Sequence, residues 1–582
     1  MGLAKRLEER RKTERLGFDL TPSTESAIPI PDLLNLQPRR AGNRDSVHAL
    51  LELAFLGRED AKGIARELGV FDRGGTDWNL ELFAEDLFVK TLIRDCLTIE
   101  IDGLRFPINE TYLYNVLSDP PTDIAAVRFR QDILRELESD AELLEATEQL
   151  YARLSRLLSM LKQPDHSAKL DINAFRFDLL SLVKWIIDWM VSEFADASSG
   201  LSRLHQAGLT IQASEEYSIL ADLLEYQSRQ STLFLSVQMG ADGELKSLNI
   251  EDIRDNTSNR FYRGPLRRIF DRIKVFVLYG YKMSPSEVAG RVLREVYFKI
   301  SPSLTPLVQL IGQLELYLAS MNLKRRVEAD GLEMSLASFD EARPLELDQV
   351  FNPLLLGLDR PAVPCNVHND QHQAITIITG PNSGGKTRLL QTIGLTQLLG
   401  QSGVYVPAAR ANLPIIRGMF VSLVESETAS QAEGRLGREL LRIRHLFEAM
   451  GSPSMVILDE LCSGTNPAEG TEIFSMVVRL LDKLRAVTFI STHFLDFARE
   501  LRDEHPSDAL EFLQVETDDQ LASTYQFRGG VAETSLASAT ADRLGVSFEA
   551  LSELIDRRRA ASGDEDGGMA PETDIVPVEV AS

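Results

Sequence analysis

Cysteine is scarce in this 582-residue sequence, which contains only three. Cys96, Cys365 and Cys462 lie far apart and in no metal-ligand spacing, which excludes a disulfide framework and a cysteine-rich zinc module. So few cysteines are typical of a protein of the reducing cytosol, and we expect a cytoplasmic protein.

Long apolar runs are also missing. The most apolar stretch, 300–323, is interrupted by Glu315, whereas a membrane-spanning helix needs roughly 18 or more apolar residues in a row. We interpret this stretch as a buried helix and expect no membrane partner. The first residues, 1–15, mix Lys, Arg and Glu without an apolar centre, so a secretory signal peptide is not expected. These two observations exclude a transporter subunit with its own membrane domain.

Positive charge is the third deficit, because 62 Lys and Arg stand against 87 Asp and Glu, a net charge of −25. Such an acidic chain is not typical of nucleic-acid-binding proteins, so binding of that kind would need a local basic patch. Apolar residues make up 44% of the chain and charged residues 26%, as in ordinary globular proteins. This composition excludes disorder of the whole chain.

Helical periodicity dominates the first half of the chain. Over 125–161 apolar residues recur every three, four or seven positions, which predicts one long helix or a pair of helices. The same pattern returns over 171–193 and, after Pro265, continues to about Arg326. Region 46–117 is helical and mixed, and its role is not indicated.

A change of periodicity interrupts these helices. The runs 233–237 and 245–250 flank an Ala-Asp-Gly turn and predict a β-hairpin that turns at Asp242 and Gly243. A small β element inserted between long helices is the pattern expected of an arm that runs out, turns and comes back.

A basic patch follows the hairpin, since 251–300 has 11 Lys and Arg against 6 Asp and Glu. The arginines at its centre are Arg260, Arg263, Arg267 and Arg268. Because Phe261 and Tyr262 lie among them, the patch suits contact with nucleic-acid phosphates. The alternative, which composition alone favours, is a solvated helix start with the two aromatic residues packed inward.

From about residue 373 short apolar strands alternate with helices, which predicts an α/β domain with a mostly parallel sheet. The expected strands are 375–379, 419–424, 455–458 and 487–491. Directly after the first strand, 380–387 reads Gly-Pro-Asn-Ser-Gly-Gly-Lys-Thr and fits the phosphate-loop pattern, with a helical segment behind it. The candidate nucleotide-binding residues are Gly380, Pro381, Asn382, Ser383, Gly384, Gly385, Lys386, Thr387 and Arg388.

Each residue type in this loop has a chemical reason. The glycines let backbone N–H groups close around phosphates, and the helix N-terminus adds positive potential. Lys386 reaches the β- and γ-phosphates, and the Thr387 hydroxyl binds magnesium. About 80 residues later, the apolar strand 455–458 delivers Asp459 as a magnesium ligand and Glu460 as the residue that polarises the attacking water.

Histidines supply two further candidates. His493 follows the strand 487–491 by two residues and is a candidate to sense the γ-phosphate or orient water, the alternative being an ordinary loop histidine. His368 and His372 have the spacing of a metal pair, but no third ligand is evident, and the Asn369-Asp370 between them favours a turn.

These motifs closely resemble those of the MutS family of DNA-repair ATPases. The resemblance is carried by 377–387, by 393–408, by Leu-Asp-Glu-Leu-Cys-Ser-Gly-Thr-Asn-Pro-Ala-Glu-Gly at 458–470, by Ser-Thr-His at 491–493 and by 530–545. Within it, the sequence motif Thr-x-Pro-x-Glu-Gly most resembles that of the second MutS branch, whose members lack the mismatch-reading domain. Upstream, Arg130-Gln-Asp-Ile133 resembles the start of the family's helical core, and 259–262 the return of its DNA clamp.

The resemblance implies ATP and magnesium as ligands, ATP hydrolysis, a homodimer with nucleotide between its ATPase domains, and branched or otherwise non-standard duplex DNA as partner. It also implies that the basic patch belongs to the clamp. The family's dimer-crossing Ser-Thr-Phe is here Gly-Arg-Leu at 434–436, so Ser430 or Arg435 would take over that contact. Tyr525 is the candidate for stacking on adenine. We expect neither a mismatch-reading domain nor a nuclease-like Smr tail.

Four regions result: 1–117, helical and of unknown role; 118–345, helical core, levers and small clamp with a hairpin at about 231–252; 346–560, MutS-type ATPase domain; 561–582, acidic disordered tail. The expected fold is multidomain, all-α with a small β insertion followed by an α/β phosphate-loop domain. The expected function is an ATP-dependent DNA clamp in repair or recombination. Alternatives are a mechanical ATPase acting on ribosomes or a protein partner, and a generic ABC-class subunit, which the absence of a Leu-Ser-Gly-Gly-Gln signature disfavours.

Overall fold

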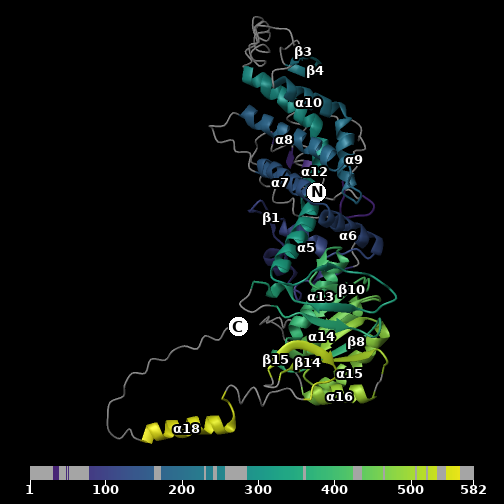
Figure 1. The fold of residues 1–582 in the computed structure, drawn as a ribbon, viewed down its shortest axis with the longest axis vertical. Coiled ribbons are helices and arrows are strands. Elements are labelled where there is room, and N and C mark those ends of the chain that lie inside the picture. Colours follow the sequence, from purple (N-terminus) through teal and green to yellow (C-terminus); the bar gives the residue numbers. More distant parts are fainter. Residues whose placement is uncertain are drawn as a thin grey trace.

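The computed structural model is elongated, with a helical half at one end and a sheet-containing half at the other (Figure 1). It describes residues 31–38, 47–48, 50–51, 55, 78–162, 172–227, 231–239, 245–255, 285–357, 362–423, 435–462, 466–504, 507–518, 522–533 and 545–563. The protein is thus multidomain, with a helical region and a mixed α/β region, as predicted.

The helical half is built from long amphipathic helices. They are α6 (Ile124–Ser139), α7 (Ala141–Lys162), α8 (Ile172–Glu193), α9 (Ser202–Gln212), α10 (Glu215–Gln227) and α12 (Pro285–Ala329). The predicted long helix is a pair, because Asp140 leaves the helical conformation and its carboxylate accepts the amide of Leu143 at 3.0 Å. The apolar stripes of α7 and α8 meet in the core, where Trp189 also donates to the Ala146 carbonyl at 3.0 Å.

Helix α12 spans 45 residues and runs along the helical half toward the sheet (Figure 1). The stretch interpreted as a buried helix lies within it, and most of its side chains are buried, including that of Glu315. Among the described helices, none combines the length and the apolar character that crossing a bilayer requires.

The predicted hairpin is present as β3 (Ser231–Met239) and β4 (Leu245–Asp255), an antiparallel pair at the far end of the helical half (Figure 1). Its turn at Asp242 and Gly243 and the four arginines of the basic patch lie outside the described residues.

Residues 78–117 differ from the helical pattern expected there. They form η1 (Leu80–Leu82), α4 (Val89–Thr91), the π-helical turn η2 (Leu92–Cys96), the hairpin β1 (Ile99–Ile101) and β2 (Leu104–Phe106), and α5 (Glu110–Leu117). The hairpin turns at Asp102 and Gly103, both with positive φ. Strands of three residues are too short for their alternation to register in the sequence.

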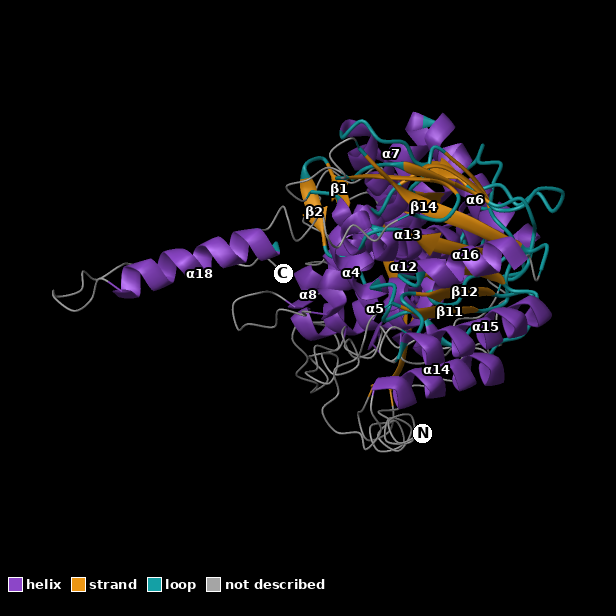
Figure 2. Ribbon diagram, turned by 90° about the horizontal axis from the view of Figure 1, so that it is seen from below, coloured by secondary structure: helices purple, strands orange, loops and turns teal. Residues whose placement is uncertain are grey.

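Within the described residues, the main sheet has the order β11-β12-β13-β8-β14-β15. Its strands are β8 (Ile375–Thr379), β11 (Met419–Ser422), β12 (Met455–Leu458), β13 (Val487–Ser491), β14 (Leu510–Thr517) and β15 (Ser523–Gly529). All pairs are parallel except β14 with β15. The four predicted strands are therefore confirmed, with β11 ending at Ser422, and Figure 2 shows β11, β12 and β14 of this sheet with helices packed around it.

The described helices of the body of this half are α13 (Lys386–Gln401), α14 (Arg435–Ala449), α15 (Pro467–Leu484) and α16 (Leu495–Glu504). A further helix, α18 (Phe548–Gly563), projects away from the body (Figures 1 and 2), and Phe548 is 83% exposed.

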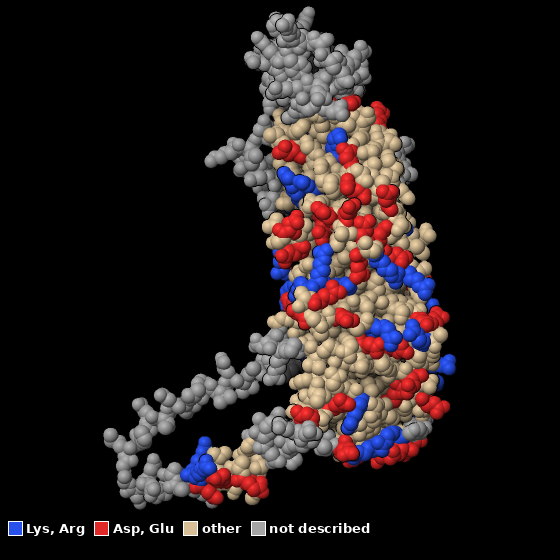
Figure 3. Space-filling view, in the orientation of Figure 1, with Lys and Arg blue, Asp and Glu red and all other residues tan. Residues whose placement is uncertain are grey.

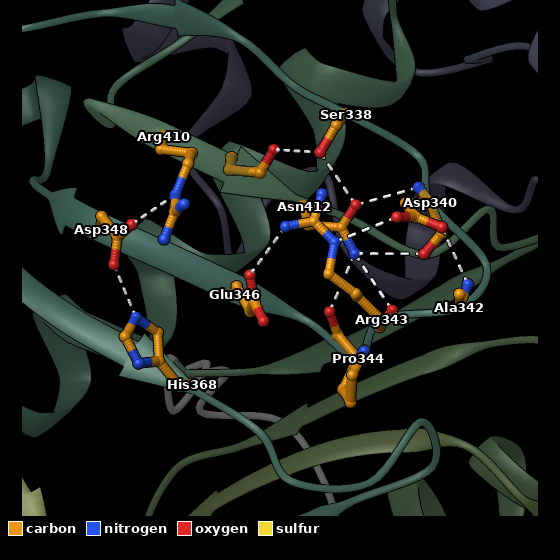
Figure 4. A network of polar contacts seen from close by, with 11 residues as sticks. Ser338, Asp340, Ala342, Arg343, Pro344, Glu346, Asp348, His368, Arg410 and Asn412 are labelled. Carbon is orange, nitrogen blue, oxygen red and sulfur yellow. Dashed lines mark hydrogen bonds and ion pairs between the residues drawn. The ribbon is translucent and has the colours of Figure 1, made fainter.

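A smaller sheet, β10-β6-β7, borders the main one. It consists of β6 (Glu346–Val350), β7 (Cys365–His368) and β10 (Arg410–Asn412), and a short pair, β5 (Ser335–Leu336) and β9 (Tyr405–Val406), lies beside it. Polar side chains connect its strands (Figure 4). The Asn412 amide oxygen accepts the Ser338 hydroxyl and the Asp340 amide, each at 2.9 Å, and its nitrogen donates to the Pro344 carbonyl at 2.9 Å.

The two halves meet around a short peptide, 31–38. Arg130 of α6 donates from Nε to the Leu34 carbonyl at 2.9 Å and from Nη1 to the Ser402 carbonyl, at the end of α13, at 3.0 Å. Arg203 of α9 donates to the Asn35 carbonyl at 2.8 Å. Because Arg130 is buried, these bonds tie the peptide, the helical core and the sheet-containing half together.

Candidate functional site: a nucleotide-binding edge of the parallel sheet

The candidate residues gather where parallel strands end. Strands β8, β12 and β13 are adjacent and run in the same direction, so their carboxyl ends share one edge of the sheet. The phosphate loop follows β8, Asp459 and Glu460 follow β12, and His493 follows β13 by two residues. In open parallel sheets this edge is where ligands bind.

The glycines of the loop permit a tight turn between β8 and α13. Gly380 has φ of +135° and Gly385 has φ of +84°, conformations that side chains disfavour. A Cβ on Gly380 or Gly384 would also lie 2.7 or 2.8 Å from the Val515 side chain of β14. Pro381 and Ser383 complete the turn with Asn382, which lies in the short helix η4 (Asn382–Gly384). The loop therefore exposes its backbone amides at the start of α13.

Lys386 is the first residue of α13, and its side chain is buried. Its Nζ donates to the carbonyls of Gly380 and Pro381, at 2.9 and 3.0 Å, so the ammonium group lies inside the loop. Burial lowers the pKa of Lys386 from its ordinary value, while the nearby carboxylates of Glu460 and Asp459 act in the opposite direction.

Thr387 and Asp459 meet across 72 positions of sequence. The Thr387 hydroxyl donates to one Asp459 carboxylate oxygen at 2.5 Å, and the Ser491 hydroxyl of β13 donates to the other. Ser491 Oγ also accepts the Glu460 amide at 2.9 Å. This oxygen-rich cluster, a hydroxyl beside a carboxylate, is the type of ligand set that magnesium prefers.

Glu460 and its neighbours form a strained loop. Glu460 has φ of +48° and Cys462 has φ of +61°, and such conformations persist only where surrounding contacts hold them. The Glu439 carboxylate of α14 accepts the Cys462 amide. Burial raises the pKa of the Cys462 thiol to about 12, so this cysteine is not a nucleophile.

Tyr525 is on β15, and His493 follows β13, the strand between β12 and β8. A Cβ built on Gly385 would lie 3.2 Å from the Tyr525 ring, so the tyrosine covers the loop, and 39% of it is exposed. His493 is half-buried, with its ring 4.3 Å from that of Phe494. Arg388 is exposed and donates to Gln391 at 3.0 Å.

Other candidates lie away from the loop or outside the described residues. Ser430 is outside them; Arg435 begins α14, but its side chain is not described. His368 Nε2 is 2.7 Å from Asp348, which also accepts Arg410 Nε at 2.7 Å (Figure 4). The described residues contain no group of three potential ligands that would make a metal site of His368 and His372.

The arrangement contains residues that the sequence alone did not single out. Ser491 bonds to Asp459 and Glu460, and Glu439 holds the loop after them. Ser491 lies in the quoted Ser-Thr-His run at a strand end, which was the available signal. Glu439 and Ser422, whose carbonyl accepts the Asp459 amide at 2.9 Å, left no such signal.

A parallel sheet, a glycine loop closing on a lysine and a threonine–aspartate pair together define a nucleotide-binding α/β domain of the phosphate-loop class. Comparison with known proteins is consistent with this: residues 376–554 match the family model of MutS domain V. This match and the curated relatives support the MutS family, on its second, MutS2 branch, for this part of the chain.

Curated relatives carry the name Endonuclease MutS2. The protein of Thermomicrobium roseum is 31% identical over 267 residues, 44% of this chain and 33% of the relative. The protein of Agathobacter rectalis is 29% identical over 41% of this chain and 29% of the relative. The protein of Streptococcus gordonii is 29% identical over 46% of this chain and 34% of the relative. The matches thus span about a third of the length of these relatives.

Proposed function

We propose that this protein hydrolyses ATP at the edge formed by β8, β12 and β13. The observation that carries the proposal is the 2.5 Å contact between Thr387 and Asp459, which brings two separate motifs into one site beside the buried Lys386. Lys386 would bind the phosphates of ATP, as the loop amides would. Glu460 would accept a proton from the attacking water, and His493 would orient that water.

The donor set fits magnesium, because a hydroxyl and a carboxylate already lie side by side. Thr387 and Asp459 would hold the ion, and bound magnesium would neutralise charge on the phosphates. Tyr525 would pack against the nucleotide above Gly385, with Arg388 at the rim of the site.

We further propose that ATP turnover moves a helical clamp on DNA. The support is the arm of long helices that ends in the β3–β4 hairpin, together with the basic run that contains Arg260, Arg263, Arg267 and Arg268. The DNA would be branched or otherwise non-standard duplex. The proposal includes a homodimer in which Ser430 or Arg435 reaches the partner's nucleotide. We do not propose the endonuclease activity that the relatives' names state, since the matches cover only about a third of those proteins.

A second candidate is a mechanical ATPase acting on ribosomes or on a protein partner. The chain's net charge of −25 favours it. Acidic side chains are also frequent over the helical half of the face shown in Figure 3. Such a surface repels the phosphate backbone of DNA.

The ATPase proposal is tested by two variants of the purified protein. Lys386→Ala and Glu460→Gln should each lower kcat by about 100-fold or more, because each removes charge placed for the transition state. Glu460→Gln should retain nucleotide binding, measured with a fluorescent ADP analogue. Lys483→Ala, an exposed lysine on α15, is the matched control and should hydrolyse ATP normally. Near-normal turnover in Lys386→Ala would refute the site.

The partner is identified by measuring hydrolysis with homoduplex, mismatched, four-way-junction and single-stranded DNA at two salt concentrations. Selective stimulation that weakens with salt, and that is lost in the Arg263, Arg267 and Arg268 triple alanine variant, would support the DNA clamp. Turnover indifferent to every DNA, together with ATP-dependent co-sedimentation with ribosomes, would support the second candidate.

A further inference from the structure

Residues 78–98, here called the connector, precede the helical core in sequence but pack against the sheet-containing half. Leu82 belongs to the apolar cluster that contains Ile377 of β8 and Val456 of β12. Leu87 is fully buried, and a Cβ on Gly394 of α13 would lie 2.6 Å from its Cδ2. The connector is therefore part of the packing around the candidate ATP site rather than a separate N-terminal module.

Asp86 is the charged residue at the centre of this packing, and it is 8% exposed. One carboxylate oxygen accepts the Leu423 amide, at the end of β11, at 3.2 Å. The other accepts Arg442 Nη2 of α14 at 2.8 Å. Arg442 Nη2 also donates to the Val421 carbonyl of β11 at 3.2 Å, so Asp86 and Arg442 together join a strand end to a helix.

Both elements that Asp86 joins also form hydrogen bonds to the loop 459–462, which contains Asp459 and Glu460. In β11, the residue before Leu423 is Ser422, whose carbonyl accepts the Asp459 amide at 2.9 Å. In α14, Glu439 lies one turn before Arg442 and accepts the Cys462 amide. A small cavity between α14 and β12 is lined by Glu439, Arg442 and Asp459, among others, which places these side chains around one space.

The other end of the connector is fixed to the long helix α12. Asn322 donates from Nδ2 to the Thr98 carbonyl at 2.9 Å, and Arg326 donates to the Cys96 carbonyl at 3.2 Å. The π-helical turn η2, closed by the Leu97 amide on the Leu92 carbonyl at 3.2 Å, lies between these anchors and Asp86. Continuous contacts thus run from α12 to the loop of Asp459 and Glu460.

We propose that Asp86 is a positioning residue for ATP hydrolysis, which sets the geometry of the Asp459–Cys462 loop through Leu423 and Arg442 and joins that loop to α12. The inference rests on the proposed ATPase function. Displacement of α12, for example when the arms engage a partner, reaches the ATP site through the connector. Asp86 is not placed to touch nucleotide or metal, and it acts through its contacts with Leu423 and Arg442.

The test compares Asp86→Asn, Asp86→Glu and Glu85→Gln in the full-length protein. Asp86→Asn should lower kcat about 10- to 100-fold while KM for ATP changes less than about two-fold, because misplaced catalytic groups slow the chemistry more than they weaken binding. Asp86→Glu keeps the charge and should recover part of the lost kcat. Glu85→Gln changes an exposed neighbouring carboxylate and should behave like the wild type. Wild-type kcat in Asp86→Asn would overturn the proposal.

Amide hydrogen-exchange rates measured in the absence of nucleotide test this inference independently of the ATPase proposal. In Asp86→Asn the amides of Leu423, Asp459 and Cys462 should exchange faster, while amides of the helical half, such as those of α8, keep wild-type rates. Faster exchange throughout the protein, or a loss of kcat shared equally by Glu85→Gln, would mean general destabilisation and overturn the positioning role. A wild-type protein without ATPase activity would defeat the proposed function, and the exchange pattern would still decide whether Asp86 orders the loop.

Discussion

Glu315 lies in the middle of α12, 3% exposed, in an apolar surrounding. Burial raises the pKa of its carboxyl group to about 7, although the Asn109 amide at 2.9 Å and the Tyr151 hydroxyl at 3.3 Å favour the charged form. The carboxyl group therefore connects three elements, α12, α7 and the start of α5, while its burial favours the protonated form.

This raised pKa predicts a pH-dependent stability. The folded protein binds more protons than the unfolded chain between the ordinary pKa of 4.5 and about 7. The contribution of Glu315 is therefore complete below about pH 4.5, falls as the pH rises, and is lost above about 7. The difference is on the order of 3 kcal/mol. The measurement is the free energy of unfolding in urea at several pH values, compared between the wild type and Glu315→Gln.

The side chain of Glu315→Gln stays uncharged at every pH. The free energy of unfolding of this variant, relative to that of the wild type, should therefore increase from pH 5 to pH 8. Glu145→Gln, an exposed carboxylate on α7, is the control and should follow the wild type at each pH. A constant difference between Glu315→Gln and the wild type would contradict the prediction.

For single residues, the sequence predicted which side chains lie together where the chain carries a contiguous motif. Lys386 and Thr387 have a fixed spacing, and an apolar strand ends at Asp459, so their meeting at one sheet edge followed from strand direction. Asp86 and Glu439 could not be found in this way. Each is a single carboxylate whose role comes from contacts to residues far along the chain, and no local pattern marks such contacts.

Helix α13 illustrates packing between elements. It is buried along almost its whole length, and its approach to the connector requires Gly394. A Cβ there would lie 2.6 Å from Leu87 and 3.1 Å from Ile457 of β12. The glycine at 394, within the stretch 393–408 that resembles the MutS family, thus has a steric reason, which is contact with a segment about 300 positions earlier.

Gly394→Ala should destabilise the protein by about 1–3 kcal/mol through overpacking. The urea midpoint of unfolding measures this. Adding Leu87→Ala should cost less in the Gly394→Ala background than in the wild type, since the two side chains compete for the same space. Gly451→Ala, where a Cβ meets no heavy atom within 4 Å, is the control. Additive effects of the two substitutions would show that they do not share this space.

Elements were predictable in proportion to their length and regularity. The long helices were predicted from strong helical periodicity, and β8, β12 and β13 from short apolar runs that alternate with helices. The hairpin of β1 and β2 was not, because three-residue strands give too little alternation. The smaller sheet was missed as well, since its strands have only three to five residues and bury only some of them.

For the whole molecule, the junction around Arg130 decides how the two halves are joined. Although burial lowers the pKa of Arg130, its donors satisfy the carbonyls of Leu34 and Ser402. Replacing it with an apolar side chain would leave both carbonyls without this donor. The peptide 31–38 would then lose its link to α6 and retain those to α9 and α12.

Arg130→Met should lower the free energy of unfolding by roughly 1–3 kcal/mol for each abandoned carbonyl. It should also speed limited proteolysis near residue 38, because the peptide is held less firmly. Arg128→Met, on an exposed turn of the same helix, is the matched control and should leave both measurements unchanged. Equal effects of the two substitutions would argue against a specific junction.

The place of Leu82 has a consequence for biosynthesis. It is buried in a cluster whose other members include Ile375, Val456 and Ile490, which are all translated long after it. At about 5–20 residues per second, the ribosome needs roughly tens of seconds to deliver them. The nascent chain must therefore keep this apolar segment unaggregated until these strands emerge, and the sheet-containing half cannot complete this core before Val531 is translated.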